Sequence, residues 1–180
     1  MSLKVAVIGP ESTGKSTLCE QLAAHYGSGW VPEYARDYLH QHGTQYTYDD
    51  LLLIAREQVA LEDKHQPLAA VNDPRKLLFI DTDLYVMKVW CEFVFDRCHT
   101  WILDNIAQRK YDLYLLCDTD LPWIQDELRE YPDLERRRQL YCIYKDMMIN
   151  QPTPWVNISG DYEQRLQTAV EAVDKLLAQQ

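Results

Sequence analysis

The sequence predicts an α/β fold, a doubly wound parallel sheet of about five strands with helices on both faces. Short apolar runs recur along the chain without the alternation of a half-exposed strand, which is typical of strands buried on both faces. Segments with helical periodicity separate these runs, and this succession favours a parallel sheet. The 180 residues contain no internal repeat and no Gly/Ser-rich linker, so we expect one domain over 1–180.

The apolar runs predict the strands. They lie at 3–8, 29–31, 77–80, 113–117 and 155–158. The stronger runs end in a polar residue or a glycine, and ligands of parallel sheets bind outside the carboxyl ends of the strands. We therefore expect one shared crevice to be faced by Gly9, Asp81, Asp118 and Gly160.

Three helix starts stand out between and after these strands. A helix over 16–24 is expected directly after the first strand and its glycine-containing loop. Thr47 followed by Asp50 forms a variant capping box that opens a second helix. Asp161 can cap the helix that closes the chain.

Composition limits the partners and the compartment. Acidic residues number 28 against 18 basic ones, a net charge of -10, which disfavours binding to nucleic acid. No apolar run approaches the roughly 20 residues of a membrane span, so no membrane partner is expected. The five cysteines form no C-x-x-C pair and no signal peptide is seen, so we expect reduced thiols in a cytoplasmic protein. The oligomeric state is left open.

The strongest motif follows the first apolar run. Residues 9–17 read Gly-Pro-Glu-Ser-Thr-Gly-Lys-Ser-Thr and match G-x-x-x-x-G-K-[ST] at every fixed position. Such a loop wraps a phosphate with backbone amides, so a P-loop NTPase fold is predicted, with ATP and Mg²⁺ as cofactors. We expect Lys15, on an exposed loop, to reach the β- and γ-phosphates, and Ser16 to hold Mg²⁺. The predicted nucleotide-binding residues of the loop are Gly9, Glu11, Ser12, Thr13, Gly14, Lys15, Ser16 and Thr17.

A phosphate loop does not name a reaction, and other features narrow the choice. The chain has no N-K-x-D motif of the kind that reads guanine in GTPases. It is too short for a motor ATPase with further subdomains. These exclusions favour a small-molecule kinase, in which a mobile basic lid and an acidic substrate-side residue supplement the phosphate loop.

Three acidic residues are candidates for the chemistry. Asp81 ends a buried strand, from which a carboxylate can hold Mg²⁺. Asp83 either reaches substrate hydroxyls or caps the next helix. Glu33, close to Tyr34 and Arg36, either accepts the proton of an attacking hydroxyl or begins a helix after Pro32 and favours its dipole.

A later basic segment, which contains Arg129, Arg136, Arg137 and Arg138, is the lid candidate. Arginines there would neutralise charge on the transferring phosphoryl group, or they form a solvated helix face in which Asp133 and Arg137 pair. Of the four, we assign catalysis to Arg129 and nucleotide binding to Arg136.

Aromatic residues can stack on a substrate ring or belong to the core. The aromatic candidates are Trp30, Tyr46, Tyr48 and Trp123.

The chain resembles the ribosylnicotinamide kinase domain of NadR-type proteins over nearly its whole length. The matching segments are 9–17, 32–38 (Pro-Glu-Tyr-Ala-Arg-Asp-Tyr), 79–83 (Phe-Ile-Asp-Thr-Asp), 121–129 (Leu-Pro-Trp-Ile-Gln-Asp-Glu-Leu-Arg) and 160–165 (Gly-Asp-Tyr-Glu-Gln-Arg). The resemblance implies ATP- and Mg²⁺-dependent phosphorylation of the ribose 5′-hydroxyl of nicotinamide riboside, giving nicotinamide mononucleotide. It departs at Pro32, where relatives have an aromatic residue, and at Glu127, where they often have glycine.

The resemblance also implies roles for individual residues. The acceptor side would be formed by Glu33, Tyr34 and Arg36, with Asp83 at the ribose, and Trp123 is a further aromatic contact. Asp81 would serve the metal, and Asp126 with Arg129 the lid. The turn of Gly160, Asp161 and Tyr162 would lie beside the adenine. NadR-type relatives carry an adenylyltransferase domain with an H-x-G-H motif, which this sequence lacks, so no second activity is expected.

Two other functions stay open on the residues alone. One keeps kinase chemistry with another nucleoside or a small alcohol as acceptor. The other is a nucleotide-binding regulator in which ATP occupancy shifts a partner-binding surface. ADP release with and without nicotinamide riboside separates the three.

Overall fold

The computed structural model describes residues 2–72, 76–124, 128 and 132–179. In chain order its elements are β1 (Leu3–Ile8), α1 (Lys15–Tyr26), β2 (Gly29–Val31), α2 (Tyr34–His42), α3 (Tyr48–Asn72), β3 (Leu77–Asp81), α4 (Leu84–Phe95), α5 (Thr100–Gln108), β4 (Leu113–Cys117), α6 (Leu134–Asn150), β5 (Trp155–Ile158) and α7 (Tyr162–Leu177).

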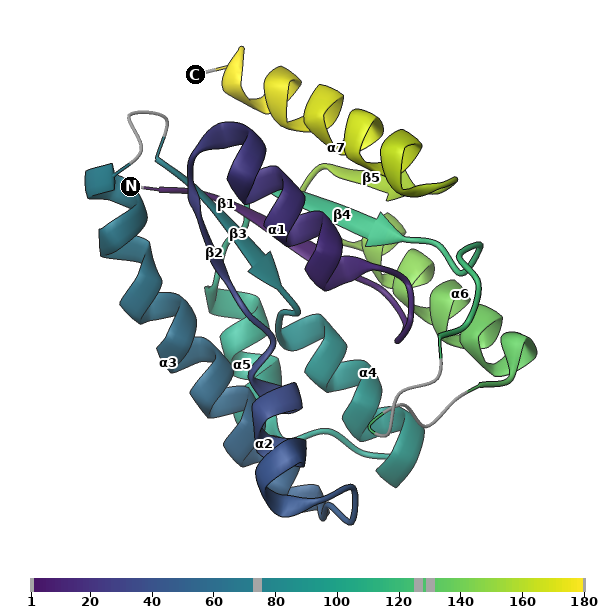
Figure 1. Ribbon diagram of the computed structural model, residues 1–180. Helices are drawn as coiled ribbons and strands as arrows, with labels where there is room; N and C mark the ends of the chain where they lie inside the picture. The colour runs from purple at the N-terminus through teal and green to yellow at the C-terminus, as the bar shows by residue number, and fades with distance from the viewer. Residues whose placement is uncertain (1, 73–75, 125–127, 129–131, 180) are drawn as a thin grey trace.

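The strands form one parallel sheet in the order β2-β3-β1-β4-β5 (Figure 1). In the central strand Val5 is in register with Phe79 of β3 on one side and with Leu113 of β4 on the other. After β1 the chain moves to the β3 side of the sheet, and after β3 it returns to the β4 side. The order therefore reverses between β1 and β4, the position at which doubly wound sheets bind their ligands.

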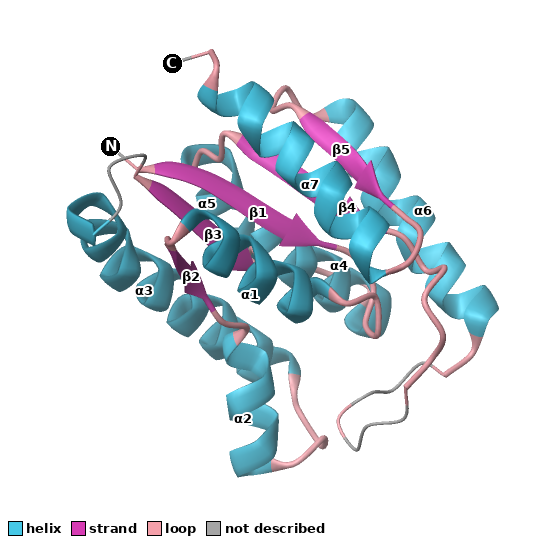
Figure 2. Cartoon of the chain, turned by 45° about the horizontal axis from the view of Figure 1, so that its top comes forward, coloured by secondary structure: helices cyan, strands magenta, loops and turns pink. Residues whose placement is uncertain are grey.

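Helices cover both faces of the sheet, as the uninterrupted apolar strands predict (Figure 2). Alternate residues of β1 point to opposite faces because the strand has a two-residue period. Val5 and Val7 pack in a core with α1 and α7. Ala6 and Ile8 pack in a second core with α4 and α6. A third core joins α2, α3, α4 and α5 beyond the edge of the sheet.

The α/β prediction is confirmed, and local signals located most elements. The strand at 77–80 extends by one residue to Asp81, and α1 begins one residue before the expected helix and continues to Tyr26. At the start of α3, Thr47 N donates to Asp50 Oδ2 and Asp50 N donates to Thr47 Oγ1, which is the predicted capping box. Asp161 caps α7 and exchanges hydrogen bonds with Gln164.

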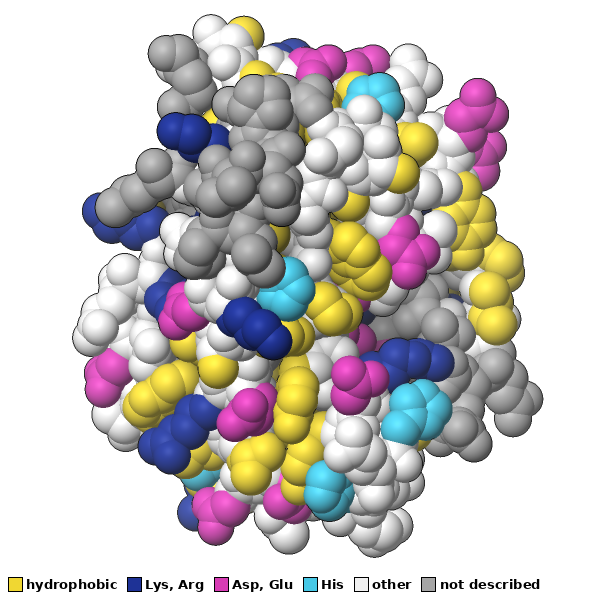
Figure 3. All heavy atoms as spheres, turned by 60° about the vertical axis from the view of Figure 1, so that its left-hand side comes forward, with side chains coloured by type: hydrophobic (Ala, Val, Ile, Leu, Met, Phe, Trp, Pro, Cys, Tyr) yellow, Lys and Arg dark blue, Asp and Glu magenta, His cyan; other side chains and the backbone are white. Residues whose placement is uncertain are grey.

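The surface carries charge of both signs. On the side of the molecule that lies at the left of Figure 1, acidic and basic side chains are interspersed with apolar ones (Figure 3). Within the described ranges, no helix is both long enough and apolar enough to cross a membrane.

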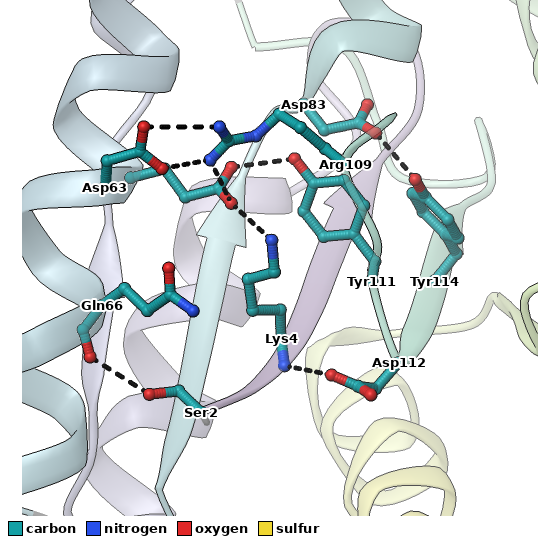
Figure 4. A network of polar contacts seen from close by, with 10 residues as sticks. Ser2, Lys4, Asp63, Gln66, Asp83, Arg109, Tyr111, Asp112 and Tyr114 are labelled. Atoms are coloured by element: carbon teal, nitrogen blue, oxygen red, sulfur yellow. Dashed lines mark hydrogen bonds and ion pairs between the residues drawn. The ribbon is translucent and has the colours of Figure 1, made fainter. Parts of the chain in front are cut away.

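A buried ionic cluster lies beside the sheet and joins α3 to the strands (Figure 4). Glu62 of α3 is 1% exposed. Its carboxylate accepts hydrogen bonds from Lys4 Nζ at 3.0 Å, Arg109 Nη2 at 2.9 Å and Tyr111 OH at 2.8 Å. A buried charge is tolerated when it is paired and hydrogen-bonded, so this cluster fixes α3 against β1 and the loop before β4.

We expect Tyr111→Phe to lower the free energy of unfolding by about 2 kcal/mol, because a hydrogen bond to a buried carboxylate is lost. Urea unfolding measures the change. Tyr38→Phe is the matched control, since the Tyr38 hydroxyl donates at 2.7 Å to Asp50 Oδ1, a carboxylate near the surface. The control should cost about 1 kcal/mol or less, because water can replace the lost bond. Equal losses in the two variants would contradict a bond at Glu62 that burial strengthens.

Candidate functional site

The phosphate loop leaves the carboxyl end of β1 at the point where the strand order reverses. Gly9 has φ 139°, and a Cβ there would lie 2.7 Å from the carbonyl oxygen of Cys117 in β4. Any other residue would therefore be strained and would collide with the neighbouring backbone. Gly14 has φ 76° and forms the left-handed N-cap of α1. Both glycines of the motif are thus required by the backbone path.

Lys15 is the first residue of α1 and is only 9% exposed. The expectation of an exposed loop position was wrong, because the loop curls over the side chain. Lys15 Nζ donates to the carbonyl oxygen of Pro10 at 3.0 Å, and Thr13 Oγ1 donates to the same oxygen at 2.7 Å. These two donors hold the loop in its curved shape from inside.

Arg165, which the motif analysis did not single out as a site residue, ties the loop to the rest of the site. It belongs to α7 and is 3% exposed. Its guanidinium donates to the carbonyl oxygens of Thr13 at 2.9 Å, Gly160 at 2.8 Å and Asp118 at 3.0 Å, and it forms an ion pair with Asp120. No local sequence pattern marks a residue whose partners lie this far apart in the chain.

Ser16 and Asp81 meet at the start of α1. Ser16 Oγ donates to Asp81 Oδ2 at 2.5 Å. Burial, and after it the negative charge of Glu33, raises the pKa of Asp81 to about 7, while Lys15 and Ser16 oppose the rise. A buried carboxylate next to a hydroxyl and a phosphate loop therefore lies where a cation would favour its charged form.

This donor set fits Mg²⁺ bound together with a nucleotide. Among the described residues no group of three or more His, Cys, Asp or Glu side chains can hold a metal ion. Mg²⁺ at nucleotide sites takes one or two carboxylates together with phosphate oxygens and waters, so a large protein cage is not needed. Ser16 and Asp81 could supply the hydroxyl and the carboxylate of such a site.

Glu33 is the N-cap residue of α2, but its side chain makes no capping hydrogen bond. Glu33 lines a cavity together with the phosphate loop. Thr82 Oγ1 lies 3.5 Å from Glu33 Oε1 and 3.5 Å from Asp81 Oδ1. Glu33 thus precedes a helix, as one interpretation expected, and its carboxylate lies beside Thr82, while the role in accepting a proton stays a prediction.

Asp83 caps α4, which is the structural interpretation of this residue. Its Oδ1 accepts from Tyr85 N at 2.9 Å and Val86 N at 3.3 Å, and its Oδ2 accepts from Tyr114 OH at 3.0 Å. Burial raises the pKa of Asp83 to about 7. Both carboxylate oxygens are engaged within the protein, and the ribose contact stays a prediction.

The cavity has a phosphate-binding wall and an apolar wall. Residues of the loop from Gly9 to Thr17 form the first wall, and Glu33 and Arg36 also line the cavity. The apolar wall comes from α2, α4 and α6 and includes three aromatic residues that sequence analysis missed. They are Trp90, Phe93 and Tyr144. Trp90 is held by a hydrogen bond from its Nε1 to Tyr46 OH at 2.8 Å.

The aromatic candidates from the sequence lie outside this cavity. Trp30 packs on the core between the sheet and α1. Tyr46 and Tyr48 belong to the core around α2, α3 and α4. Trp123 lines a second cavity between the loop after β4 and the start of α6. Tyr34 packs against the α2–α3 core, and its backbone N–H bonds Gln58.

The basic segment is divided between different surroundings. Asp126, Glu127 and Arg129 lie outside the described residues. Arg136 is exposed and lies 6.0 Å from the ring centre of Phe93, which lines the first cavity. Arg137 is buried with its guanidinium 5.2 Å from the ring centre of Trp123. A uniformly solvated helix face was therefore wrong for Arg137.

The carboxyl ends of the strands lie at one edge, but the four residues predicted there do not share one cavity. Gly9 lines the first cavity and Asp118 the second, whereas Asp81 and Gly160 line neither. Gly160 N donates to Asp120 Oδ2 at 2.5 Å, which holds the turn before α7 against the loop after β4. A Cβ on Gly14 would lie 3.4 Å from Tyr162 Cε1, so this turn borders the phosphate loop. The prediction of one shared crevice was therefore wrong, because two neighbouring cavities lie at this edge.

Comparisons with known proteins agree with this geometry. A family model described as an AAA domain matches residues 4–165. The trifunctional NAD biosynthesis/regulator protein NadR of Escherichia coli is 30% identical over 181 residues, which cover 98% of this chain and 43% of that protein. The chain therefore spans less than half the length of this relative. The resemblance seen in the motifs is confirmed over nearly the whole chain.

Solved structures share the fold. A crystal structure of NadR in complex with NR has a TM-score of 0.79 at 23% identity, covering 98% of this chain and 52% of that one. A crystal structure of NadR in complex with NAD and AMP-PNP has a TM-score of 0.76 at 24% identity, covering 98% of this chain and 50% of that one. Thymidylate kinase from Ehrlichia chaffeensis has a TM-score of 0.66 at 15% identity, covering 97% of this chain and 98% of that one. The predicted P-loop fold is confirmed.

Proposed function

The chain belongs to the AAA-domain family matched over residues 4–165, and from that premise we propose that it is an ATP- and Mg²⁺-dependent kinase. Its proposed acceptor is the ribose 5′-hydroxyl of nicotinamide riboside, and its product is nicotinamide mononucleotide. The kinase domain would extend over 1–180. The NadR structure with NR and the identity with a NAD biosynthesis protein support this acceptor.

One observation carries the proposal: Glu33 and the phosphate loop line the same cavity. A kinase must bring a hydroxyl into line with the γ-phosphoryl group, and a carboxylate can orient that hydroxyl and accept its proton. A site that only binds nucleotide can use one carboxylate for Mg²⁺, which Asp81 can supply, but it needs no second carboxylate for a hydroxyl.

The nucleotide would lie along the phosphate loop. Its amides would bind the phosphate oxygens, and Lys15 Nζ would exchange its Pro10 carbonyl partner for the β- and γ-phosphates. When bound, Mg²⁺ supplies positive charge to the phosphates, with Ser16 and Asp81 as its protein ligands. The turn of Gly160, Asp161 and Tyr162 would lie beside the base.

The acceptor would occupy the other half of the cavity. Glu33 would bind the 5′-hydroxyl, and Arg36 lies on the same side. The aromatic side chains of Trp90, Phe93 and Tyr144 offer an apolar surface for a planar ring, the role that Pro32 cannot fill. Asp83 would contact the ribose with an oxygen that now accepts from Tyr114.

Steady-state ADP release with a panel of acceptors tests the proposal. Nicotinamide riboside should stimulate ADP release and appear as the mononucleotide in the products. Stimulation only by another nucleoside or small alcohol would retain a kinase but overturn this acceptor. A rate of ADP release that no acceptor changes would overturn kinase activity.

We expect Asp81→Asn to raise sharply the Mg²⁺ concentration needed for half-maximal activity, because an amide oxygen binds the cation more weakly than a carboxylate. Mg²⁺ titrations at saturating ATP measure the change. Asp83→Asn is the matched control, since asparagine can still accept the two capping hydrogen bonds of α4. The control should leave the Mg²⁺ requirement unchanged and raise KM for the acceptor. Superimposable titrations of wild type and Asp81→Asn would place the metal elsewhere.

A further inference from the structure

A buried amide on α3 connects the two acidic segments of the site. Gln58 is 2% exposed. Its Oε1 accepts from Tyr34 N at 2.7 Å, and its Nε2 donates to the carbonyl oxygens of Pro32 at 3.3 Å and Asp81 at 3.4 Å. A peptide N–H can only donate and a carbonyl can only accept, so these partners fix the orientation of the amide. Both the oxygen and the nitrogen of the Gln58 amide therefore bond backbone atoms.

Two of these partners flank Glu33. An N-cap carboxylate ordinarily accepts from the second or third amide of its own helix, but the Glu33 side chain makes no such bond. Gln58 instead binds the backbone on both sides of Glu33, through the amide of Tyr34 and the carbonyl oxygen of Pro32. The backbone around Glu33 is thus held from a different helix, while Glu33 lines the cavity.

The third partner is the residue whose carboxylate accepts from Ser16. Gln58 therefore holds the backbone of Asp81 while Ser16 holds its side chain. Glu33 and Asp81 lie close enough for one hydroxyl, that of Thr82, to approach both at 3.5 Å. Two carboxylates at such separation repel each other, so their spacing depends on how firmly their backbones are held.

We propose that Gln58 is a positioning residue that sets the spacing between Glu33, which faces the acceptor, and Asp81, which lies beside the phosphate loop. The inference rests on the proposed function. Gln58 does not line the cavity, so it acts through these two segments. A misplacement of about 1 Å between reacting groups can lower a rate by up to about 10²-fold, whereas nucleotide contacts made by the phosphate loop stay intact.

The test is Gln58→Met, which keeps the length and volume of the side chain but has no amide. Ile54→Val is the matched control: it lies one turn earlier on α3, is fully buried and touches neither acidic segment through a hydrogen bond. For both variants we would measure kcat and KM for nicotinamide riboside, the affinity for a non-hydrolysable ATP analogue, melting temperature, and hydrogen exchange at the Tyr34 amide.

In Gln58→Met we expect the Tyr34 amide to exchange at least about 10-fold faster. We also expect kcat/KM for the riboside to fall at least about 10-fold while affinity for the ATP analogue changes less than about twofold. Ile54→Val should lower the melting temperature without either change.

Four results would overturn the inference. Faster exchange with an unchanged kcat/KM would make Gln58 purely structural. Equal losses of riboside turnover and ATP-analogue affinity, or the same kinetic loss in Ile54→Val, would show a general loosening of the site. A wild-type protein that phosphorylates no riboside would overturn the proposed function first, and this inference with it.

Discussion

Lys15→Ala is expected to lower kcat/KM by about 10²-fold or more, equivalent to roughly 3 kcal/mol of transition-state stabilisation. The Lys15 ammonium group would supply positive charge to the transferring phosphoryl group, and its removal leaves the phosphate loop without a cationic side chain there. The same change also removes the hydrogen bond to Pro10 O, so a stability loss of about 1 kcal/mol should accompany the kinetic one.

Lys88→Ala is the control for the loss of a lysine. Lys88 lies on α4 and pairs with Glu92 one turn later, at 2.6 Å. Such an i,i+4 pair contributes only about 0.2–0.5 kcal/mol, so this variant should keep full activity. Near-normal turnover by a folded Lys15→Ala protein would defeat phosphoryl transfer as the reaction of this site.

Glu33→Gln is expected to lower kcat by about 10²-fold with little change in ATP affinity. Glutamine keeps the shape of the side chain and can still bind a hydroxyl, but it lacks the basicity to accept the proton. Since the Glu33 side chain makes no capping hydrogen bond, the substitution should cost no more than about 1 kcal/mol of stability. Measurements of kcat, ATP affinity and melting temperature on one variant give all three quantities.

Asp37→Asn provides the matched comparison. Asp37 is an exposed carboxylate in the first turn of the same helix, so its loss removes a similar charge near the helix dipole without touching the cavity. It should cost a few tenths of a kcal/mol and leave kcat unchanged. If Glu33→Gln behaved like Asp37→Asn, Glu33 would be a structural residue, and Asp83 would be the next candidate for the base.

The sequence by itself determined features that depend on a few consecutive residues. Continuous apolar runs gave strands buried on both faces, because each strand carries its own burial pattern. The glycines of the phosphate loop were recognisable because they serve backbone conformations and close approaches that other residues cannot adopt. Thr47 and Asp161 were recognisable as caps because their hydrogen bonds close within three residues.

Only the tertiary structure decided how the acidic and aromatic residues divide their roles. Asp83 and Glu33 both precede helices, yet only Asp83 caps its helix with its own side chain, whereas the backbone around Glu33 is held by Gln58 from a distant helix. The aromatic wall centred on Trp90 exists because three helices converge on the cavity. The sequence pattern of an apolar helix face does not show whether that face packs in a core or lines a cavity.

The same limit applies to the residues that fasten the site together. The bond from Arg165 to Thr13 spans 152 positions in the chain, and the bonds of Gln58 span 23 to 26. A local pattern records which conformation a segment prefers, whereas such contacts depend on how distant segments pack against a common sheet. Sequence therefore determined the phosphate loop and the fold, and packing determined which side chains complete the site.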